Sequence, residues 1–91
     1  MKPAEIQFSL NLEALSSPQC RRIVQALYKE SYAQEDLSKI CKLSIASVGK
    51  HVEILRVAGL VKLRKVDGVI KVSLQVTKLE PTLEWFKTLT N

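Results

Sequence analysis

The sequence predicts one small, mainly α-helical domain that carries a single β-hairpin (an α+β arrangement). Apolar residues recur at helical spacing over most of the chain, whereas residues 61–74, VKLRKVDGVIKVSL, alternate between apolar and polar as strands do. Asp67-Gly68, in the middle of this alternation, is a signal for a two-residue turn between antiparallel strands. With 91 residues, 46% of them hydrophobic, the chain has room for one hydrophobic core.

Three helices are predicted before the hairpin. Ser17-Pro18 is typical of a helix start, with Ser17 as the cap, and the apolar spacing extends this helix to about residue 29. After a loop at residues 30–32, a shorter helix ends near Cys41. Ser44 then caps a third helix, residues 45–58, which ends at Gly59 in the left-handed conformation. The expected buried rows are Cys20, Ile23, Val24 and Leu27, then Leu37, Ile40 and Cys41, then Val48, Val52 and Leu55.

The two ends of the chain are predicted less uniformly. Residues 4–10 fit both a strand and a helix, while Leu12 to Leu15 favour a helix. Pro81 starts a last helix that runs to about residue 89. Adjacent helical residues point about 100° apart, so this helix is apolar over a wide arc, and an exposed apolar patch usually marks an interface. We therefore expect a homodimer interface at Leu83, Trp85, Phe86 and Leu89.

Basic residues gather in one third of the sequence. Residues 39–71 hold eight basic and two acidic residues, whereas the rest of the chain is close to neutral. Such a segment is compatible with an ordinary solvated surface and with a surface that faces a polyanion. On the hairpin, alternation is expected to bury Leu63, Ile70, Val72 and Leu74 on one face and to place Lys62, Arg64 and Lys71 on the other.

The order of the predicted elements is that of a winged helix-turn-helix. Two short helices are joined by a tight turn, the second is well capped, and a basic hairpin follows. In such domains the second helix enters the DNA major groove by its N-terminal end. The candidate DNA-binding residues are Ser44, Ile45, Ala46, Ser47, Gly49, Lys50, His51 and Arg56 on the helix, and Lys62, Arg64, Lys65 and Lys71 on the hairpin.

The exposed start of this helix offers little base-specific chemistry. Ser47 and Lys50 can hydrogen-bond a base or a phosphate, Ile45 and Ala46 can touch thymine methyl groups, and Gly49 lets the backbone approach closely. Because there is no Arg or Asn for a bidentate base contact, we expect affinity to come mainly from phosphates, and sequence preference from shape and methyl contacts.

Four segments resemble the ArsR-type winged-helix repressors when taken in order: LEALSSPQCRRIV, EDLSKICKLS, SVGKHVEILRVAGLV and KLRKVDGVIKVSL. The resemblance runs from about Leu10 to Leu74 and is most specific over residues 43–61. It implies a dimeric, double-stranded DNA-binding transcriptional regulator, a repressor, whose first and last helices pair across a two-fold axis. The family's metal-binding cysteine box would fall at residues 33–35, AQE, which hold no cysteine, and the last helix holds no histidine. We therefore expect neither a metal site nor another cofactor, and the sequence names no effector.

Other functions have weaker support. His51 is the only histidine and has no nucleophile or paired carboxylates at a recognisable spacing, so we expect no enzyme and no catalytic residues. Cys20 and Cys41 lie on apolar helix faces, where core packing is favoured over redox sensing or metal binding. Unpaired cysteines, no long apolar run and no signal peptide favour a cytoplasmic protein without a membrane partner. A winged-helix module that binds protein or RNA remains the alternative.

Overall fold

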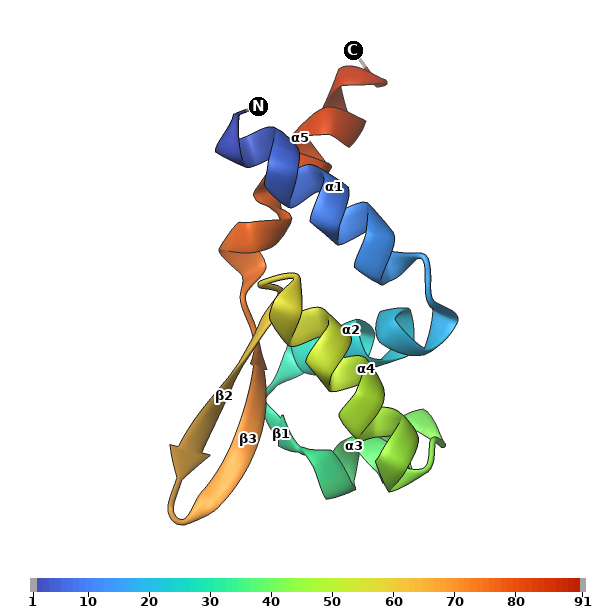
Figure 1. The fold of residues 1–91 in the computed structure, drawn as a ribbon, viewed down its shortest axis with the longest axis vertical. Helices are drawn as coiled ribbons and strands as arrows, with labels where there is room; N and C mark the ends of the chain where they lie inside the picture. Colours follow the sequence, from blue (N-terminus) through green and yellow to red (C-terminus); the bar gives the residue numbers. More distant parts are fainter. Residues whose placement is uncertain (1, 91) are drawn as a thin grey trace.

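The computed structural model describes residues 2–90, and these form a winged helix-turn-helix domain (Figure 1). The chain runs through α1 (Pro3–Leu15), α2 (Pro18–Lys29), β1 (Tyr32–Ala33), α3 (Gln34–Cys41), α4 (Ile45–Val57), β2 (Val61–Val66) and β3 (Val69–Leu74). A short 3-10 helix, η1 (Val76–Leu79), leads into α5 (Glu80–Thr88). The predicted fold class and the order of its elements are therefore confirmed.

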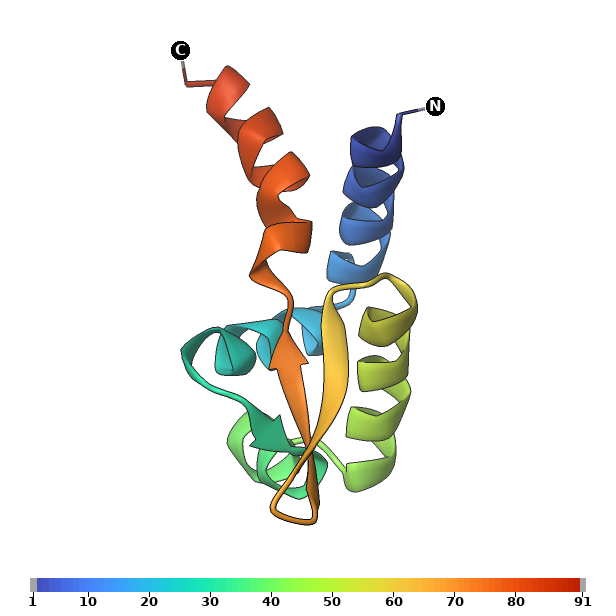
Figure 2. The same cartoon turned by 90° about the vertical axis from the view of Figure 1, so that its left-hand side faces the viewer.

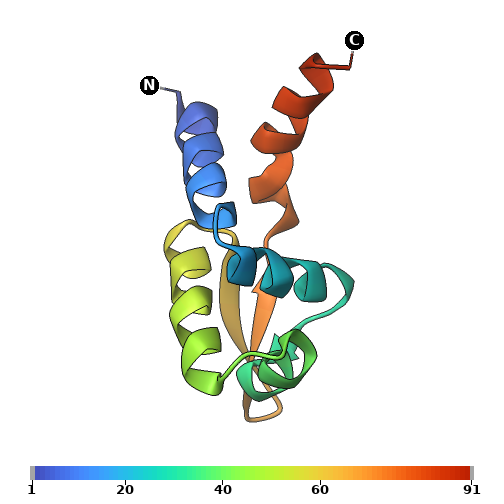
Figure 3. The same ribbon diagram turned by 90° about the vertical axis from the view of Figure 1, so that its right-hand side faces the viewer.

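Helices α1 and α5 extend from one end of the domain and the β2–β3 hairpin from the other, which gives the molecule its extents of 42 × 24 × 22 Å. Figures 2 and 3 show α1 and α5 rising from the same end of the body and splaying apart. The core lies between these ends, where α2, α3 and α4 pack together and against the base of the hairpin. Its fully buried side chains include Ile23, Leu37, Val48, Val52, Leu55, Leu60 and Val72. No helix within residues 2–90 is long and apolar enough to span a bilayer.

The predicted helix signals at Ser17, Ser44 and Gly59 are confirmed. The Ser17 hydroxyl accepts a hydrogen bond from the Cys20 amide, and the Ser44 hydroxyl accepts one from the Ser47 amide. Gly59 has a φ of +84°, and the Leu60 amide donates to the Leu55 carbonyl across it. These bonds satisfy backbone groups that a helix end otherwise leaves unpaired, so both ends of α4 are fixed.

The hairpin turn is also confirmed, because both of its central residues have positive φ. Asp67 has a φ of 51° and Gly68 a φ of 81°, as a type I′ turn requires. The sheet has three strands rather than the two predicted, in the order β1-β3-β2, with both pairs antiparallel. Tyr32 was expected in a loop, but it pairs with Val72. A two-residue strand is too short to show alternation, so only its partner reveals it.

Two predictions of burial are wrong on the hairpin. Leu63 and Ile70 were expected in the core, but they are 44% and 56% exposed. Val61 and Val72 are buried and Leu74 is partly buried, because these residues lie at the hairpin base against the helices. The hairpin extends past the body (Figure 1), so the outer part of the same face has nothing to pack against.

Helices α1 and α3 also differ from the sequence-based expectation. α1 is helical from Pro3, so the strand alternative for residues 4–10 is wrong. Its buried residues are Asn11 and Ala14 rather than its large apolar ones, which explains why no apolar stripe identified it. In α3, Leu37 and Cys41 are buried but Ile40 is 49% exposed, because this two-turn helix meets the core through one narrow face.

Candidate nucleic-acid interface

The N-terminal end of α4 is held in place and left uncovered. Val48, Val52 and Leu55 are buried against the rest of the domain, which fixes the rotation of the helix about its axis. On its other side Ile45 is 58% exposed, and Ala46 and Lys50 are exposed as well. The sequence-predicted reading surface is therefore accessible around these residues, with Ser44 at its start.

The turn before α4 is a tight one. Lys42 takes the left-handed conformation, with φ 56° and ψ 47°, and its amide donates to the Ser38 carbonyl. The Ser38 hydroxyl donates to the Leu43 carbonyl, so the two residues between α3 and the Ser44 cap are bonded back onto α3. α3 and α4 are consequently joined as a rigid helix-turn-helix pair.

Gly49 lies on the flank of α4 that faces the start of α3. A Cβ atom at this position would lie 3.7 Å from the Gln34 side-chain oxygen, an ordinary contact, and the backbone φ is helical. Nothing in the folded domain therefore requires glycine at this position.

His51 is placed on the opposite flank, partly buried toward α2. Its Nδ1 lies 2.7 Å from the Ser47 carbonyl oxygen, a geometry in which Nδ1–H donates to that acceptor. Its own carbonyl lies 3.9 Å from the Cys20 thiol. The Nδ1 atom of His51 is thus engaged within α4, which leaves Nε2 as the ring nitrogen that could meet a ligand.

Arg56 lies at the far end of α4, eleven residues after Ile45 and roughly 16 Å along the axis. Its guanidinium donates two hydrogen bonds to the Glu53 carboxylate, at 2.8 and 2.6 Å. This pairing raises the pKa of Arg56 and lowers the pKa of Glu53, chiefly through the hydrogen bonds. Of the predicted DNA-binding cations, Arg56 is the one that already has a carboxylate partner in the described residues.

The wing carries its cations on two faces. Arg64 is directly opposite Lys71, and Lys62 is two residues from Arg64 on the same strand, so these three share one face. Lys65 is opposite Ile70 and lies on the other face. Like charges directly across a strand pair repel one another, so the Arg64–Lys71 pair destabilises the isolated hairpin. An anion bound over this face would remove that penalty.

The predicted dimer residues form an exposed apolar surface on α5. Leu83, Trp85, Phe86 and Leu89 are all exposed in the single chain. The Trp85 ring meets Phe8 of α1 edge-on at a centroid distance of 5.5 Å. The aromatic surface therefore continues from α5 onto α1, at the end of the molecule away from the wing.

Both cysteines are buried, as expected for core residues. Cys20 is 0% and Cys41 is 7% exposed. Burial raises the pKa of each thiol above its ordinary value, although a hydrogen bond to Ser17 partly offsets this for Cys20, and the charge of Arg22 partly offsets it for Cys41. Within residues 2–90, no three His, Cys, Asp or Glu side chains are grouped so that they could hold a metal ion.

A polar network that was not predicted joins α1 to η1, to α5 and to the end of α4. Asn11, which is fully buried, donates to the Lys78 carbonyl at 2.8 Å and to the Thr82 hydroxyl at 2.9 Å. Gln7 donates to Asn11 and to the carbonyl of Ala58 at the end of α4. The spacing of Gln7 and Asn11, one helical turn apart, was a signal for this pair once α1 was known to be a helix.

Solved structures of transcriptional regulators share this arrangement. An ArsR-like transcriptional regulator from Rhodococcus sp. matches with a TM-score of 0.82 and 21% identity, over 92% of this chain and 79% of that chain. NolR from Sinorhizobium fredii matches with a TM-score of 0.75 and 26% identity, over 98% and 93% of the two chains. The homodimeric winged helix-turn-helix DNA-binding domain of a possible ArsR-family regulator from Mycobacterium bovis matches with a TM-score of 0.73 and 15% identity, over 90% and 78%.

No protein-family model matches the chain, and no curated protein matches it either. The likeness therefore rests on the structure and on the motifs described above. On that basis the chain has the winged helix-turn-helix fold shared by ArsR-type transcriptional regulators.

Proposed function

We propose that this chain is a homodimeric transcriptional regulator, a repressor, that binds double-stranded DNA. The start of α4 enters the major groove, and the β2–β3 wing contacts the backbone or the minor groove beside it. The observation that carries the proposal is one of position. The uncovered start of α4 lies at the same end of the domain as the wing, whose cations form no ion pair within residues 2–90 (Figure 1).

The chemistry of this end fits a phosphate backbone better than it fits a specific base. Lys50 lies on the exposed side of α4. On the wing, the cations of Arg64 and Lys71 lie opposite each other and repel one another unless an anion is bound between them. The apolar Ile45 and Ala46 can supply methyl contacts in the groove. This combination favours salt-dependent binding with modest sequence preference.

A second copy of the chain is proposed to pack against the exposed aromatic residues of α5. Trp85, Phe86 and their apolar neighbours on α5 lie at the end opposite the wing, so a two-fold dimer through them leaves both reading surfaces free. The similar Mycobacterium bovis domain is homodimeric. Two reading helices would then meet two half-sites on one duplex, as symmetric helix-turn-helix dimers do.

A salt series on a random and a selected duplex, followed by fluorescence anisotropy, tests the proposal. Each lost phosphate contact reduces the slope of log affinity against log salt by about 0.9, doubled in a symmetric dimer. We expect Arg64→Ala to flatten the slope by about two units on both duplexes. Lys78→Ala is the matched control, because it removes an exposed cation from η1, away from the wing. It should leave the slope unchanged. Equal slopes for the wild type and Arg64→Ala would refute the wing contact.

One observation favours a second function, a winged-helix module that binds protein. Leu63, Val66, Val69 and Ile70 are all exposed on the wing, and Ile45 is exposed on α4. Exposed apolar residues at these positions suit a protein partner as well as DNA. Wild-type protein without salt-dependent binding to either duplex at micromolar concentration would favour this function over the first.

A further inference from the structure

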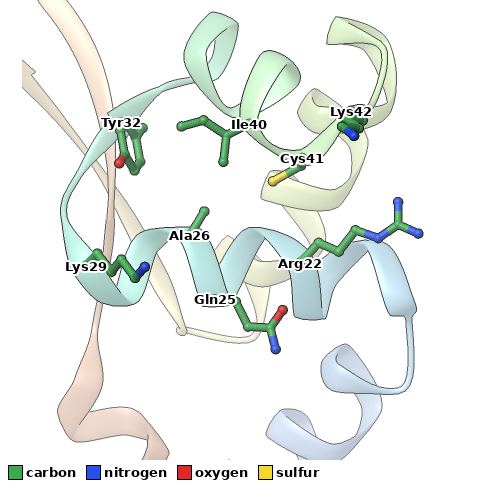
Figure 4. Close-up of a pocket in the computed structure, with 8 residues that line it drawn as sticks. All are labelled: Arg22, Gln25, Ala26, Lys29, Tyr32, Ile40, Cys41 and Lys42. Carbon is green, nitrogen blue, oxygen red and sulfur yellow. The ribbon is translucent and has the colours of Figure 1, made fainter.

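An open hollow on the side of the domain is lined by α2, the β1 segment and the end of α3. Its volume is about 640 Å³, within the range of small-molecule sites. Figure 4 shows α2 along one side of it, with Tyr32 and the end of α3 along the other. This hollow, which we call the α2–α3 hollow, involves none of the residues assigned above to DNA or to the dimer.

One end of the hollow is cationic. Arg22 of α2 and Lys42 of the turn lie together at this end (Figure 4). Both side chains are exposed, and neither takes part in the ion pairs found within residues 2–90. Two such cations, from different elements at the same rim, suit a single anionic group.

The other end is close to neutral. Lys29 lies there beside Tyr32, but the Glu30 carboxylate is also near. It raises the pKa of the Tyr32 phenol chiefly by hydrogen bonding, and the burial of the phenol and the charge of Glu30 add to the rise. Asp36 adds to the same effect on Tyr32. Two acidic groups therefore offset the single lysine at this end, and an anion is favoured only at the end with Arg22.

The wall between the two ends is apolar and incompletely covered. Ala26 and Tyr32 are partly buried, and Ile40, which departs from its expected core position, is 49% exposed toward the hollow. Cys41 lines the same wall with its buried thiol. An apolar ligand placed along Ala26 and Ile40 would remove this surface from water, which favours binding.

We propose that the α2–α3 hollow binds a small organic anion that has a flat apolar body and one carboxylate. The carboxylate lies between Arg22 and Lys42, and the body packs over Ala26 and Ile40 toward Tyr32. Because Lys42 is the residue at which the chain turns toward α4, such a ligand contacts the element that positions the reading helix.

Binding can be measured without DNA, by NMR titration of the full 91-residue chain. The probes are 1-naphthaleneacetate and 1-naphthaleneacetamide, which have nearly the same shape but differ in charge. We expect the acetate to produce saturable amide shifts centred on Ala26, Ile40 and Cys41, and the acetamide to bind several-fold more weakly. Arg22→Gln and Lys42→Gln should each raise the Kd of the acetate by about two- to fivefold, as for exposed charge pairs.

Lys39→Gln is the control, because it removes a cation from the exposed side of α3 without changing the hollow. The proposal is overturned if the two probes bind equally, if Lys39→Gln matches Lys42→Gln, or if the shifts centre on the aromatic patch of α5. A DNA salt series separates a small anion from a nucleic-acid phosphate: loss of slope in Arg22→Gln would assign the cationic end to DNA and overturn the small-ligand site. Failure of DNA binding itself leaves the probe titration unaffected.

Discussion

Gly49 offers a direct separation of stability from DNA binding, through the substitution Gly49→Ala. It is the fifth residue of a 13-residue helix, where glycine costs backbone entropy on folding and alanine does not. An added Cβ would make an ordinary 3.7 Å contact with the Gln34 side chain, and the helical φ is open to any L-residue. The substitution therefore gains helix propensity without strain.

The expected gain is about 0.8–1.0 kcal/mol in the free energy of unfolding. For a domain of this size, about 1 kcal/mol corresponds to a rise in Tm of roughly 4–8 °C. Chemical denaturation with urea measures the gain as a shift of the midpoint at constant slope. Because the stability of any dimer depends on its concentration, both proteins must be compared at the same protomer concentration.

DNA affinity should move in the opposite direction. If Gly49 is present so that the α4 backbone can approach DNA closely, its replacement by alanine weakens binding while the fold becomes more stable. Gly49→Glu adds bulk and negative charge and should weaken binding further. A Gly49→Ala protein that is less stable than wild type would refute the packing argument. A more stable one with unchanged DNA affinity would refute the close approach of this part of α4.

Further experiments test the α1–α5 end of the molecule and the core. Trp85→Ala should shift the proposed dimer toward monomers in sedimentation experiments, since the loss of a large aromatic side chain from a buried interface costs about 3–5 kcal/mol. A wild-type chain that stays monomeric at tens of micromolar would contradict the interface. Cys20 and Cys41 should react with a thiol reagent slowly when native and rapidly when unfolded. Burial raises the folded-state pKa of both thiols, so the stability that the neutral thiols contribute is present at neutral pH. This stability is lost as the pH rises through the alkaline range in which unfolded thiols ionise. Urea titrations at increasing pH would measure the loss. Asn11→Leu should lower the free energy of unfolding by about 2–4 kcal/mol, because it leaves the Lys78 carbonyl, the Thr82 hydroxyl and a Gln7 amide proton without their partner. Unchanged stability would show that water replaces these bonds.

The elements that were predictable carry their own local signals. Ser17 and Ser44 bond to backbone amides of their own helices, and Asp67-Gly68 adopts the positive φ that its turn requires. Each of these features is decided within a few residues, so the sequence contains the information in one place. The order of the helices and the wing followed from these local decisions, and the candidate DNA surface followed from that order.

The features that escaped prediction depend on partners far away in the chain. Tyr32 becomes a strand residue only because β3 lies beside it. Asn11 is buried only because η1 and α5 lie over it, and its hydrogen-bond partner Lys78 is 67 residues away in the sequence. Leu63 alternates like a buried strand residue but lies on a hairpin that extends beyond the core. Periodicity reports which face of an element is apolar, and it does not report whether anything covers that face.

That distinction changes how the uncovered apolar residues should be interpreted. Ile40 borders a hollow with one cationic end, Trp85 lies at the end of the molecule opposite the wing, and Leu63 lies beside the wing cations. Each has different surroundings, and each is proposed to contact a different partner: a small organic anion, a second copy of the chain, and a duplex or a protein near the wing. A substitution that removes one of these contacts should leave the other two intact, because the three surfaces lie on separate elements.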